Sequence, residues 1–427
     1  MAATTQKLNY SSVPPRATSS RAIRNEVVPS NGQSFNMNQT IIFDVPANLN
    51  NTFCDFQSSY VKLKFTNNDA VDLNFENGGF PACIRRIVLE LGGQTLFSCD
   101  SWNVLYEMML TLDTANQFRG NAGKRLFGAG TGLGTSVAAG TSRTVCFPLV
   151  LTPLVGATKY FPLFGRDRLR IRLELDTAAR SLIAGDAGIV DNDITIDECS
   201  LIMYNLELGS DVMSQVAAAS GGSFKMTMPS YQHHQSSLGT TESTLVSTLG
   251  FSMSSLNRIL VAQQISGTAA AESRIANRNR IFLKRFFVTI GGIKYPQKDL
   301  QSLGTAGDLG AGAEILAEAL ISERSLCSWA HDSSVETGAG WSSNETLGTA
   351  ANNTGTFLVD LDLESQRVQG GEGSLGLVAG VNCVGQQVQA TFEYGANRTY
   401  DHVINVFGEH TMMASLDLNT LTWSLAV

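Results

Sequence analysis

Two seventeen-residue stretches of the chain repeat one pattern, and this repeat constrains the fold more than any other feature of the sequence. Ile84–Asp100 reads IRRIVLELGGQTLFSCD, and Leu283–Asp299 reads LKRFFVTIGGIKYPQKD. At a constant offset of 199 residues, Arg86 aligns with Arg285, and apolar positions align with apolar positions on both sides of it. The repeat predicts one structural unit that is used twice.

Each stretch carries a pair of adjacent glycines at its centre, Gly92-Gly93 in the first and Gly291-Gly292 in the second. Two adjacent glycines suit a tight hairpin, because both turn positions can take φ > 0 without a clash of a Cβ atom. We therefore expect a β-hairpin in each stretch. The four glycines are expected to serve backbone geometry and not ligand binding.

The length of 427 residues allows two domains of about 200 residues, each able to bury a core. The stretch SQVAAASGGS at 214–223 lies near the middle of the chain and has the small-residue composition of a linker. We predict a flexible arm over 1–35, a first domain over 36–213, this linker, and a second domain over 224–427.

The composition favours strands and turns. Charged residues make up 16% of the chain, below the usual quarter or so, and small polar residues with 40 glycines take their place. Apolar alternation predicts strands over 41–45, 60–65, 144–151, 169–175, 200–208, 244–249, 258–262, 357–363, 387–394, 402–407, 412–418 and 421–425. Helical spacing predicts a helix over 102–112 and another over 314–326, one after each hairpin. Many short strands with one helix after the same hairpin in each half predict two β-sandwiches of like topology.

Two stretches, 119–142 and 333–356, are rich in small residues and are expected to be long surface loops. Such loops are where a glycan-binding protein carries aromatic side chains. The aromatic residues in them are Phe127 and Trp341.

The N-terminal 35 residues are rich in Ser, Pro and Arg and lack apolar periodicity. The cations here are Lys7, Arg16, Arg21 and Arg24, against Glu26 alone. The segment is interpreted either as a floppy terminus or as a basic arm that reaches a neighbouring subunit or an acidic partner. The net charge of −8 excludes a generally basic nucleic-acid binder.

The seven cysteines are widely spread and never form CxxC, which predicts reduced, mostly buried thiols and argues against a disulfide framework or a zinc site. The first residues, MAATTQKLNYSS, lack the apolar core of a signal peptide. The longest apolar stretch, 145–157, is interrupted by polar residues and prolines and is too short to span a bilayer. We expect a protein that is made and kept inside the cell, not secreted.

Nucleotide-binding motifs are missing from the glycine-rich stretch. Its glycines at 128, 130, 132 and 134 do not meet G-x-G-x-x-G in any frame. Gly123-Lys124 is followed by Arg125, where a P-loop has Ser or Thr.

The five histidines do not suggest catalysis. His233 and His234 are adjacent and are expected to point to opposite faces of a strand, and His331-Asp332 has no evident nucleophile. We interpret all five as structural or surface residues.

Two groups of acidic residues are candidates for cation-binding or catalytic sites. Asp360, Asp362 and Glu364 alternate, so their carboxylates are expected to share one strand face. Three interpretations of this face are open: a cation site, a glycosidase-like pair of carboxylates, or solvated side chains with no further role. The solvated face is the favoured interpretation. The group Asp191-Asn192-Asp193 with Asp197-Glu198 offers calcium ligands but departs from the EF-hand loop, with Ile196 at the glycine position.

Basic pairs, Arg85-Arg86 and Lys284-Arg285, stand at the base of both hairpins and are expected to pair with acids in the same fold or at an interface. No catalytic constellation assembles from these patterns. The sequence therefore predicts no catalytic residue, no cofactor and no metal site.

Several motifs together resemble a known family. The pattern R-I-x-L-x-L-G-G-Q followed by N-V-L-Y (Asn103–Tyr106) resembles the first jelly roll of double jelly-roll major capsid proteins. The pattern is most similar to the major capsid proteins of polinton-like viruses and virophages. Tectivirus-like phages and adenovirus hexons are more distant relatives. The stretch Tyr160–Phe164 leading into Leu169–Leu175, and I-N-V-F-G-E-H at Ile404–His410, extend the resemblance over roughly residues 35–425.

This resemblance implies an all-β fold with two tandem eight-stranded jelly rolls, and a homotrimer that forms a pseudo-hexameric capsomer. It implies an icosahedral shell around double-stranded DNA, with penton and minor capsid proteins as further partners, and location in the virion. The basic arm, through Lys7, Arg16, Arg21 and Arg24, is then expected to contact neighbouring capsomers, the genome or an inner membrane. The stretches 119–142 and 333–356 are the expected tower loops, and no small-molecule substrate is implied.

Two alternatives remain open at the level of the sequence. A tandem β-sandwich that binds glycans is marked by aromatic or carboxylate clusters on loops. A sandwich-fold glycoside hydrolase or lyase is expected to use the carboxylates at 360–364.

Overall fold

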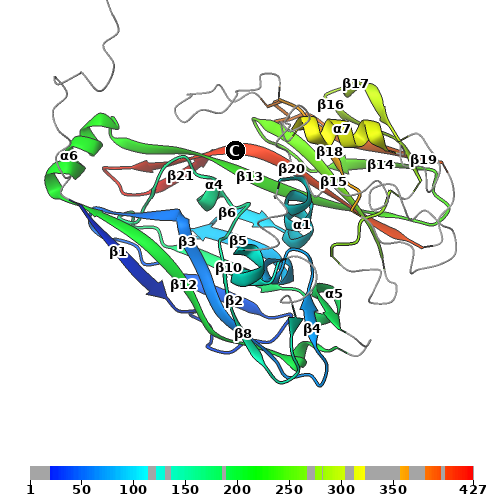
Figure 1. Ribbon diagram of the computed structural model, residues 1–427. Helices are drawn as coiled ribbons and strands as arrows, with labels where there is room; N and C mark the ends of the chain where they lie inside the picture. The colour runs from blue at the N-terminus through cyan, green and yellow to red at the C-terminus, as the bar shows by residue number, and fades with distance from the viewer. Residues whose placement is uncertain are drawn as a thin grey trace, which may run out of the picture.

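The computed structural model describes residues 20–113, 122–129, 136–184, 189–266, 275–280, 282–302, 312–322, 356–364, 380–395 and 400–426. Within these ranges the strands pair antiparallel and divide into a first half, from residue 20 to 208, and a second half, from 223 to 426. Figure 1 shows the first half in blue to green and the second half in green to red.

The first half contains two four-stranded layers. One sheet has the order β1-β12-β3-β8 and the other has the order β2-β10-β5-β6. Their strands are β1 (Ser20–Val27), β2 (Thr40–Asp44), β3 (Thr52–Asn67), β5 (Ile84–Leu91), β6 (Gln94–Cys99), β8 (Ser142–Phe147), β10 (Leu169–Leu175) and β12 (Ile194–Leu208). The short strand β9 (Phe161–Pro162) pairs with β3, and a small sheet joins β11 (Leu182–Ala184), β4 (Leu73–Phe75) and β7 (Ser136–Val137).

The second half repeats this arrangement. One sheet has the order β13-β20-β15-β18 and the other has the order β14-β19-β16-β17. Their strands are β13 (Ser223–Leu238), β14 (Thr244–Leu249), β15 (Leu256–Ile265), β16 (Leu283–Ile290), β17 (Ile293–Gln301), β18 (Val359–Asp362), β19 (Val388–Tyr394) and β20 (His402–Asp417). A last strand, β21 (Trp423–Ala426), pairs with β20.

If the eight principal strands of either half are counted in chain order, one sheet holds the first, eighth, third and sixth, and the other holds the second, seventh, fourth and fifth. This is the strand order of a jelly roll, an eight-stranded double sheet with two Greek keys. The prediction of two tandem jelly rolls is confirmed.

Helices within the described residues are few and short. They are α1 (Trp102–Asp113), α3 (Ala122–Phe127), α4 (Pro153–Gly156), α5 (Ala178–Ser181), α6 (Ser210–Ala219) and α7 (Ala313–Ser322), with 3₁₀ turns at Phe80–Cys83 and Asp191–Asp193. α1 follows the β5–β6 hairpin and α7 follows the β16–β17 hairpin, as the apolar spacing predicts.

Alternating side chains build the layers. In β10, the four aliphatic residues are buried and face the core, while Arg170, Arg172 and Glu174 lie on the outer face. The period of two along a strand places every second side chain on the same face, so one face of the sheet is apolar and the other is solvent-exposed. The resulting core has a main cluster that runs through both halves and a smaller one around Phe53, Phe164 and Leu416.

The predicted flexible arm over 1–35 is wrong for residues 20–27. These residues form β1, the edge strand that pairs with β12 from Ser20 opposite Leu208 to Val27 opposite Leu201. The strand lacks strong apolar alternation because it lies at a sheet edge and most of its side chains are exposed or half-exposed. The first jelly roll therefore begins at Ser20 and not at residue 36.

The stretch 214–223, which was predicted to be a linker, is mostly helical in the structure. It supplies most of α6 and the first residue of β13. Its three consecutive alanines favour a helix, and Gly221-Gly222, with φ of 65° and 89°, form the turn after it.

The first of the two predicted surface loops is partly folded into the molecule. Within 119–142, residues 122–127 form α3 and Phe127 is buried. The second predicted loop, 333–356, lies outside the described residues apart from Thr356.

The two halves pack closely together. Figure 1 shows the long pair β13 and β20 extending across the first half towards α6, and β13 packs against β6 and α4. No helix within the described ranges is both long enough and apolar enough to cross a membrane.

Candidate functional site

The two glycine turns have the same geometry. Gly92 and Gly93 have φ of 59° and 86°, and Gly291 and Gly292 have φ of 57° and 85°. The Gly92 N–H donates to the carbonyl of Arg168 at 3.2 Å, and the Gly291 N–H donates to that of Gln387 at 3.1 Å. The turns are therefore equivalent in conformation and in the strand connection that holds them.

Replacement of Gly92 with valine is expected to destabilise the fold more than replacement of Gly93. Both positions need left-handed backbone, which costs an L-residue about 1–2 kcal/mol. A Cβ at Gly92 also meets the Asp167 carboxylate at 2.6 Å, whereas a Cβ at Gly93 has nothing within 4 Å. Urea unfolding of the two variants measures the difference; a Gly92→Val protein as stable as the wild type contradicts the turn assignment.

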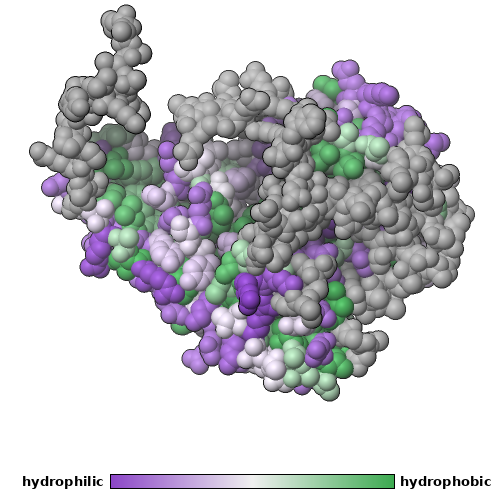
Figure 2. Space-filling view, in the orientation of Figure 1, coloured by the Kyte–Doolittle hydropathy of each residue, from purple (hydrophilic) through white to green (hydrophobic). Residues whose placement is uncertain are grey.

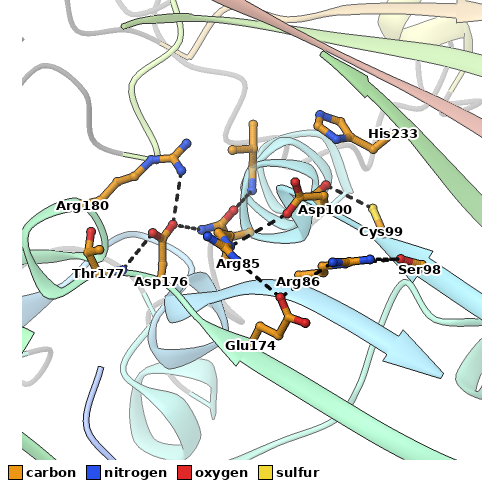
Figure 3. Close-up of polar contacts among 12 residues, drawn as sticks. Arg85, Arg86, Ser98, Cys99, Asp100, Glu174, Asp176, Thr177, Arg180 and His233 are labelled. Carbon is orange, nitrogen blue, oxygen red and sulfur yellow. Dashed lines mark hydrogen bonds and ion pairs between the residues drawn. The ribbon is translucent and has the colours of Figure 1, made fainter. Parts of the chain in front are cut away.

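A charged cluster stands at the base of the first hairpin (Figure 3). The Glu174 carboxylate lies 3.4 Å from Arg85 Nη2 and 3.9 Å from Arg86 Nη1, and Asp100 Oδ1 lies 3.9 Å from Arg85 Nε. Arg86 Nη2 also donates to Ser98 Oγ at 2.9 Å. The arginines are 44% and 39% exposed, so each ion pair contributes at most about 1 kcal/mol.

The second hairpin carries the same charges. Arg285 donates to both oxygens of Glu393, at 2.6 Å, and to Asp299 Oδ2 at 3.0 Å. Glu174 lies opposite Arg86 in the sheet register, and Glu393 lies opposite Arg285. The repeat therefore extends beyond the hairpin to the neighbouring strand, and the predicted pairing of these arginines with acids of the same fold is confirmed.

Helix α1 is held by buried polar contacts next to this cluster. Asp176 Oδ2 accepts from Asn103 Nδ2 at 2.8 Å and from Arg180 at 3.4 Å, and its other oxygen accepts the Thr177 N–H at 2.8 Å (Figure 3). Glu107, also buried, accepts the Gly78 N–H at 2.6 Å. These contacts fix the helix, and no motif in the sequence indicated Asp176.

The predicted solvated face of carboxylates at 360–364 is wrong for Asp360. Its side chain has no exposed surface and lies 3.4 Å from Arg258 Nη1. Arg258 Nε donates to Glu409 at 2.6 Å, and the Tyr231 hydroxyl donates to the same oxygen at 3.0 Å. The cation on β15 therefore joins two acids inside the second half, because the second jelly roll folds β18 and β20 on either side of β15.

This network reaches other elements. Ser322 Oγ of α7 donates to Asp360 Oδ1 at 3.0 Å, and Arg258 Nη2 donates to Met109 Sδ of α1 at 3.1 Å. It thus connects α1 of the first half with the core of the second. Burial, followed by the nearby Glu409 charge, raises the pKa of the Tyr231 hydroxyl, which keeps its proton for that hydrogen bond.

Two of the described histidines, His233 and His234, have hydrogen-bond partners of an ordinary structural kind. His233 Nε2 lies 3.0 Å from Asn405 Oδ1, and His234 Nε2 lies 3.1 Å from Ser247 Oγ. Figure 3 shows His233 of β13 beside Asp100, at the contact between the halves. His331 lies outside the described residues.

Acid is expected to destabilise the protein through His410. Burial lowers its pKa from 6.5 to about 4. The unfolded chain binds this proton near pH 6.5 and the folded chain only near pH 4, so stability is lost as the pH falls through that window. Urea unfolding between pH 7 and pH 5 is expected to show a smaller loss in His410→Gln than in the wild type; equal losses contradict this assignment.

The acidic group at 191–198 is used for local structure. Asp191 accepts the Ala178 N–H at 2.7 Å, Asp193 accepts the Val190 N–H at 2.9 Å, and Glu198 lies 3.5 Å from Lys64 Nζ. Among the described residues, no cluster of His, Cys, Asp and Glu has the geometry to hold a metal ion.

The described cysteines are free thiols, and all except Cys146 are buried. Burial raises the pKa of Cys54 and of Cys199 to about 12, so these thiols stay protonated and unreactive. This matches the expected reduced, mostly buried thiols; Cys327 lies outside the described residues.

Of the four predicted arm cations, two belong to β1. Arg21 pairs with Glu207 at 3.5 Å, and Arg24 Nη2 donates to the Tyr60 hydroxyl at 3.4 Å. Both contacts are within the chain, so Arg21 and Arg24 are part of the first jelly roll. Lys7 and Arg16 lie outside the described residues.

The junction between the halves is closed by the C-terminal strand. The Trp423 ring stacks on Phe161 with centroids 5.0 Å apart, and the backbone N–H of Trp423 donates to Asp167 Oδ2 at 3.1 Å. Asp167 is also the side chain that faces Gly92. The last strand thereby connects the second jelly roll to the first hairpin turn.

No protein-family model matches the chain, and no curated protein sequence matches it. Solved structures do match over nearly the whole length. The PBCV-1 protein VP54, fitted into a reconstruction of the virophage Sputnik, aligns with a TM-score of 0.63 and 9% identity, covering 98% of this chain and 99% of that one. The Faustovirus major capsid protein aligns at 0.58 and 10%, covering 95% and 92%.

The Sputnik virophage structure itself aligns at 0.55 with 9% identity, covering 100% of this chain and 93% of that one. Identities this low establish a common fold. The resemblance to double jelly-roll major capsid proteins is thus confirmed as a resemblance of fold across both halves.

Proposed function

We propose that this chain is the major capsid protein of a double-stranded DNA virus, and that its work is done by contact surfaces between copies. The observation that carries the proposal is the full-length likeness in fold to capsid proteins, which includes both jelly rolls and the connection between them. In this proposal the protein is located in the virion.

The duplicated fold supports a homotrimer as the unit of assembly. Three copies of a chain with two like sandwiches present six near-equivalent edges, which is the shape that packs in a hexagonal array. The low charged fraction of 16% suits broad contacts between copies, because interface cores are depleted in charge. In this proposal trimers tile an icosahedral shell, with penton and minor capsid proteins as partners.

The N-terminal segment before Ser20 has a role in the same proposal. Lys7 and Arg16 are its cations, and they are assigned to contacts with neighbouring capsomers, genomic DNA or an inner membrane. Two cations give only weak, salt-sensitive attraction to a polyanion. The division into two jelly rolls, 36–213 and 224–427, remains our prediction, with the first extended back to Ser20 so that it includes β1.

Sizing with light scattering and electron microscopy test the proposal. The expected particle has about three times the chain mass of 45.8 kDa and appears as hexagonal trimers or closed shells. A stable monomer in all conditions, with no larger particle by microscopy, overturns it.

A further inference from the structure

A groove of about 850 Å³ opens at the end of the molecule where α6 joins the two halves. Figure 2 shows hydrophobic side chains gathered on this face beside α6. A hollow lined in this way on a soluble protein is typically an interaction site. The residues that carry the argument are Phe53, Phe224, Leu206, Leu208, Val212 and Val216.

The floor of the groove is rigid and aromatic. Phe53, Phe164 and Phe224 pack edge to face, with ring centroids 5.4, 5.9 and 5.7 Å apart. They come from β3, from the segment after β9, and from β13, so the floor spans the junction between the jelly rolls. Two of these rings, Phe53 and Phe224, line the groove.

One wall of the groove is α6. Val212, Val216 and Ala219 recur at helical spacing on one face and line the groove. None of the residues of this helix is buried. The apolar face of an amphipathic helix ordinarily packs against other parts of the protein. In α6 this face stays exposed to the groove.

The charges that border the groove have one sign. Among the described residues, Lys159 and Lys225 are the charged ones that line the groove, and no carboxylate lines it. An anionic group is therefore favoured at its rim. The same charges disfavour the chain's own basic N-terminal segment as the occupant.

The lining also favours an alkyl chain over a peptide. A peptide brings an N–H and a C=O at every residue, and each costs free energy if it is buried without a hydrogen bond. The floor and the α6 wall present phenyl, isobutyl, isopropyl and methyl groups. The polar lining groups, such as Ser220 and Ser223, lie at the turn between α6 and β13.

We propose that this groove binds a long-chain fatty acid anion, with the alkyl chain between the phenylalanine floor and α6 and the carboxylate at Lys159 and Lys225. The site is separate from the charged hairpin bases and does not depend on the proposed capsid function. The shared chemistry with a membrane lipid is an alkyl chain with an anionic head. The free fatty acid is the proposed occupant, because the lining offers an apolar floor and a helical wall to an alkyl chain and two lysines to one carboxylate.

Fluorescence titration with cis-parinaric acid on the full chain tests the proposal. One saturable site per chain is expected, with palmitate as a competitor and hexadecanol a weaker one. Val216→Asp is expected to weaken binding at least tenfold, because it places a carboxylate in the groove, and Lys225→Glu several-fold. Gln215→Asp, which changes an exposed residue of α6 outside the lining, is the matched control and is expected to bind as the wild type does.

Five results overturn the proposal, and four of them come from the binding assay itself. They are the absence of saturable binding, equal affinity of Val216→Asp and wild type when both have the same circular dichroism spectrum, equal competition by hexadecanol, and binding confined to anionic phospholipid vesicles. Probe release whenever copies associate assigns the groove to contact between copies, and this also overturns it. Sizing of the same samples reports on trimer formation independently.

Discussion

Replacing Arg258 with alanine is expected to lower the free energy of unfolding by about 3–5 kcal/mol. The guanidinium lies between Asp360, which has no exposed side-chain surface, and Glu409. Its removal leaves two carboxylates without their cation in a low-dielectric interior, which is the costly way to break a buried ion network. Urea unfolding at pH 7 measures the loss.

Two further variants make this result interpretable. Arg170→Ala removes an exposed pair, since Arg170 is 47% exposed and lies 2.8 Å from Asp44, and should cost less than about 1 kcal/mol. A triple variant with Arg258→Met, Asp360→Leu and Glu409→Leu removes every charge and should recover most of the lost stability. A cost for Arg258→Ala as small as that for Arg170→Ala contradicts the assignment.

Trp102→Ala is expected to cost about 3–5 kcal/mol, as deletions of large buried aromatic side chains do. Trp102 has no exposed surface, begins α1, and stacks on Tyr106 with ring centroids 5.2 Å apart. Its loss leaves a cavity between α1 and the sheet below and is expected to loosen α1 from the Asp176 contact as well. Thermal and urea unfolding measure it.

The matched variant is Trp102→Phe. It keeps an aromatic ring in the site and removes an indole N–H that has no hydrogen-bond partner among the described residues. Its cost is therefore expected to be considerably smaller than that of alanine. Equal costs for the two variants indicate that the helix, and not the ring, sets the stability of this region.

Local patterns predicted the repeated units well. Leu169–Leu175 and Thr244–Leu249 are strands with the expected bounds, and the Gly-Gly hairpins and the helices after them are found in both halves. These elements depend on nearest neighbours: a period of two, a period of 3.6, and a turn that needs φ > 0. The order of such elements was enough to indicate the fold class.

Other elements had weaker signals. β1 is an edge strand with mostly exposed side chains, so residues 20–27 lack the apolar alternation of a half-buried strand. β13 includes Pro229 and two histidines; a strand was expected around His233 and His234 but not over the whole of 223–238. Both are strands because β12 and β20, buried and long, offer them full-length partners.

The sequence by itself determined the duplicated all-β fold, because the hairpin, its arginine and its glycines recur at one spacing and act locally. Only the tertiary structure decided which charges are buried and where an apolar hollow opens. Asp360 looked like a solvated carboxylate until β15 placed Arg258 beside it. Gly92 and Gly93 are indistinguishable in the sequence pattern. In the structure Asp167 faces Gly92 and not Gly93, and Asp167 is hydrogen-bonded to the last strand. Burial and proximity between distant strands are properties of the whole packed chain, and no short window of sequence contains them.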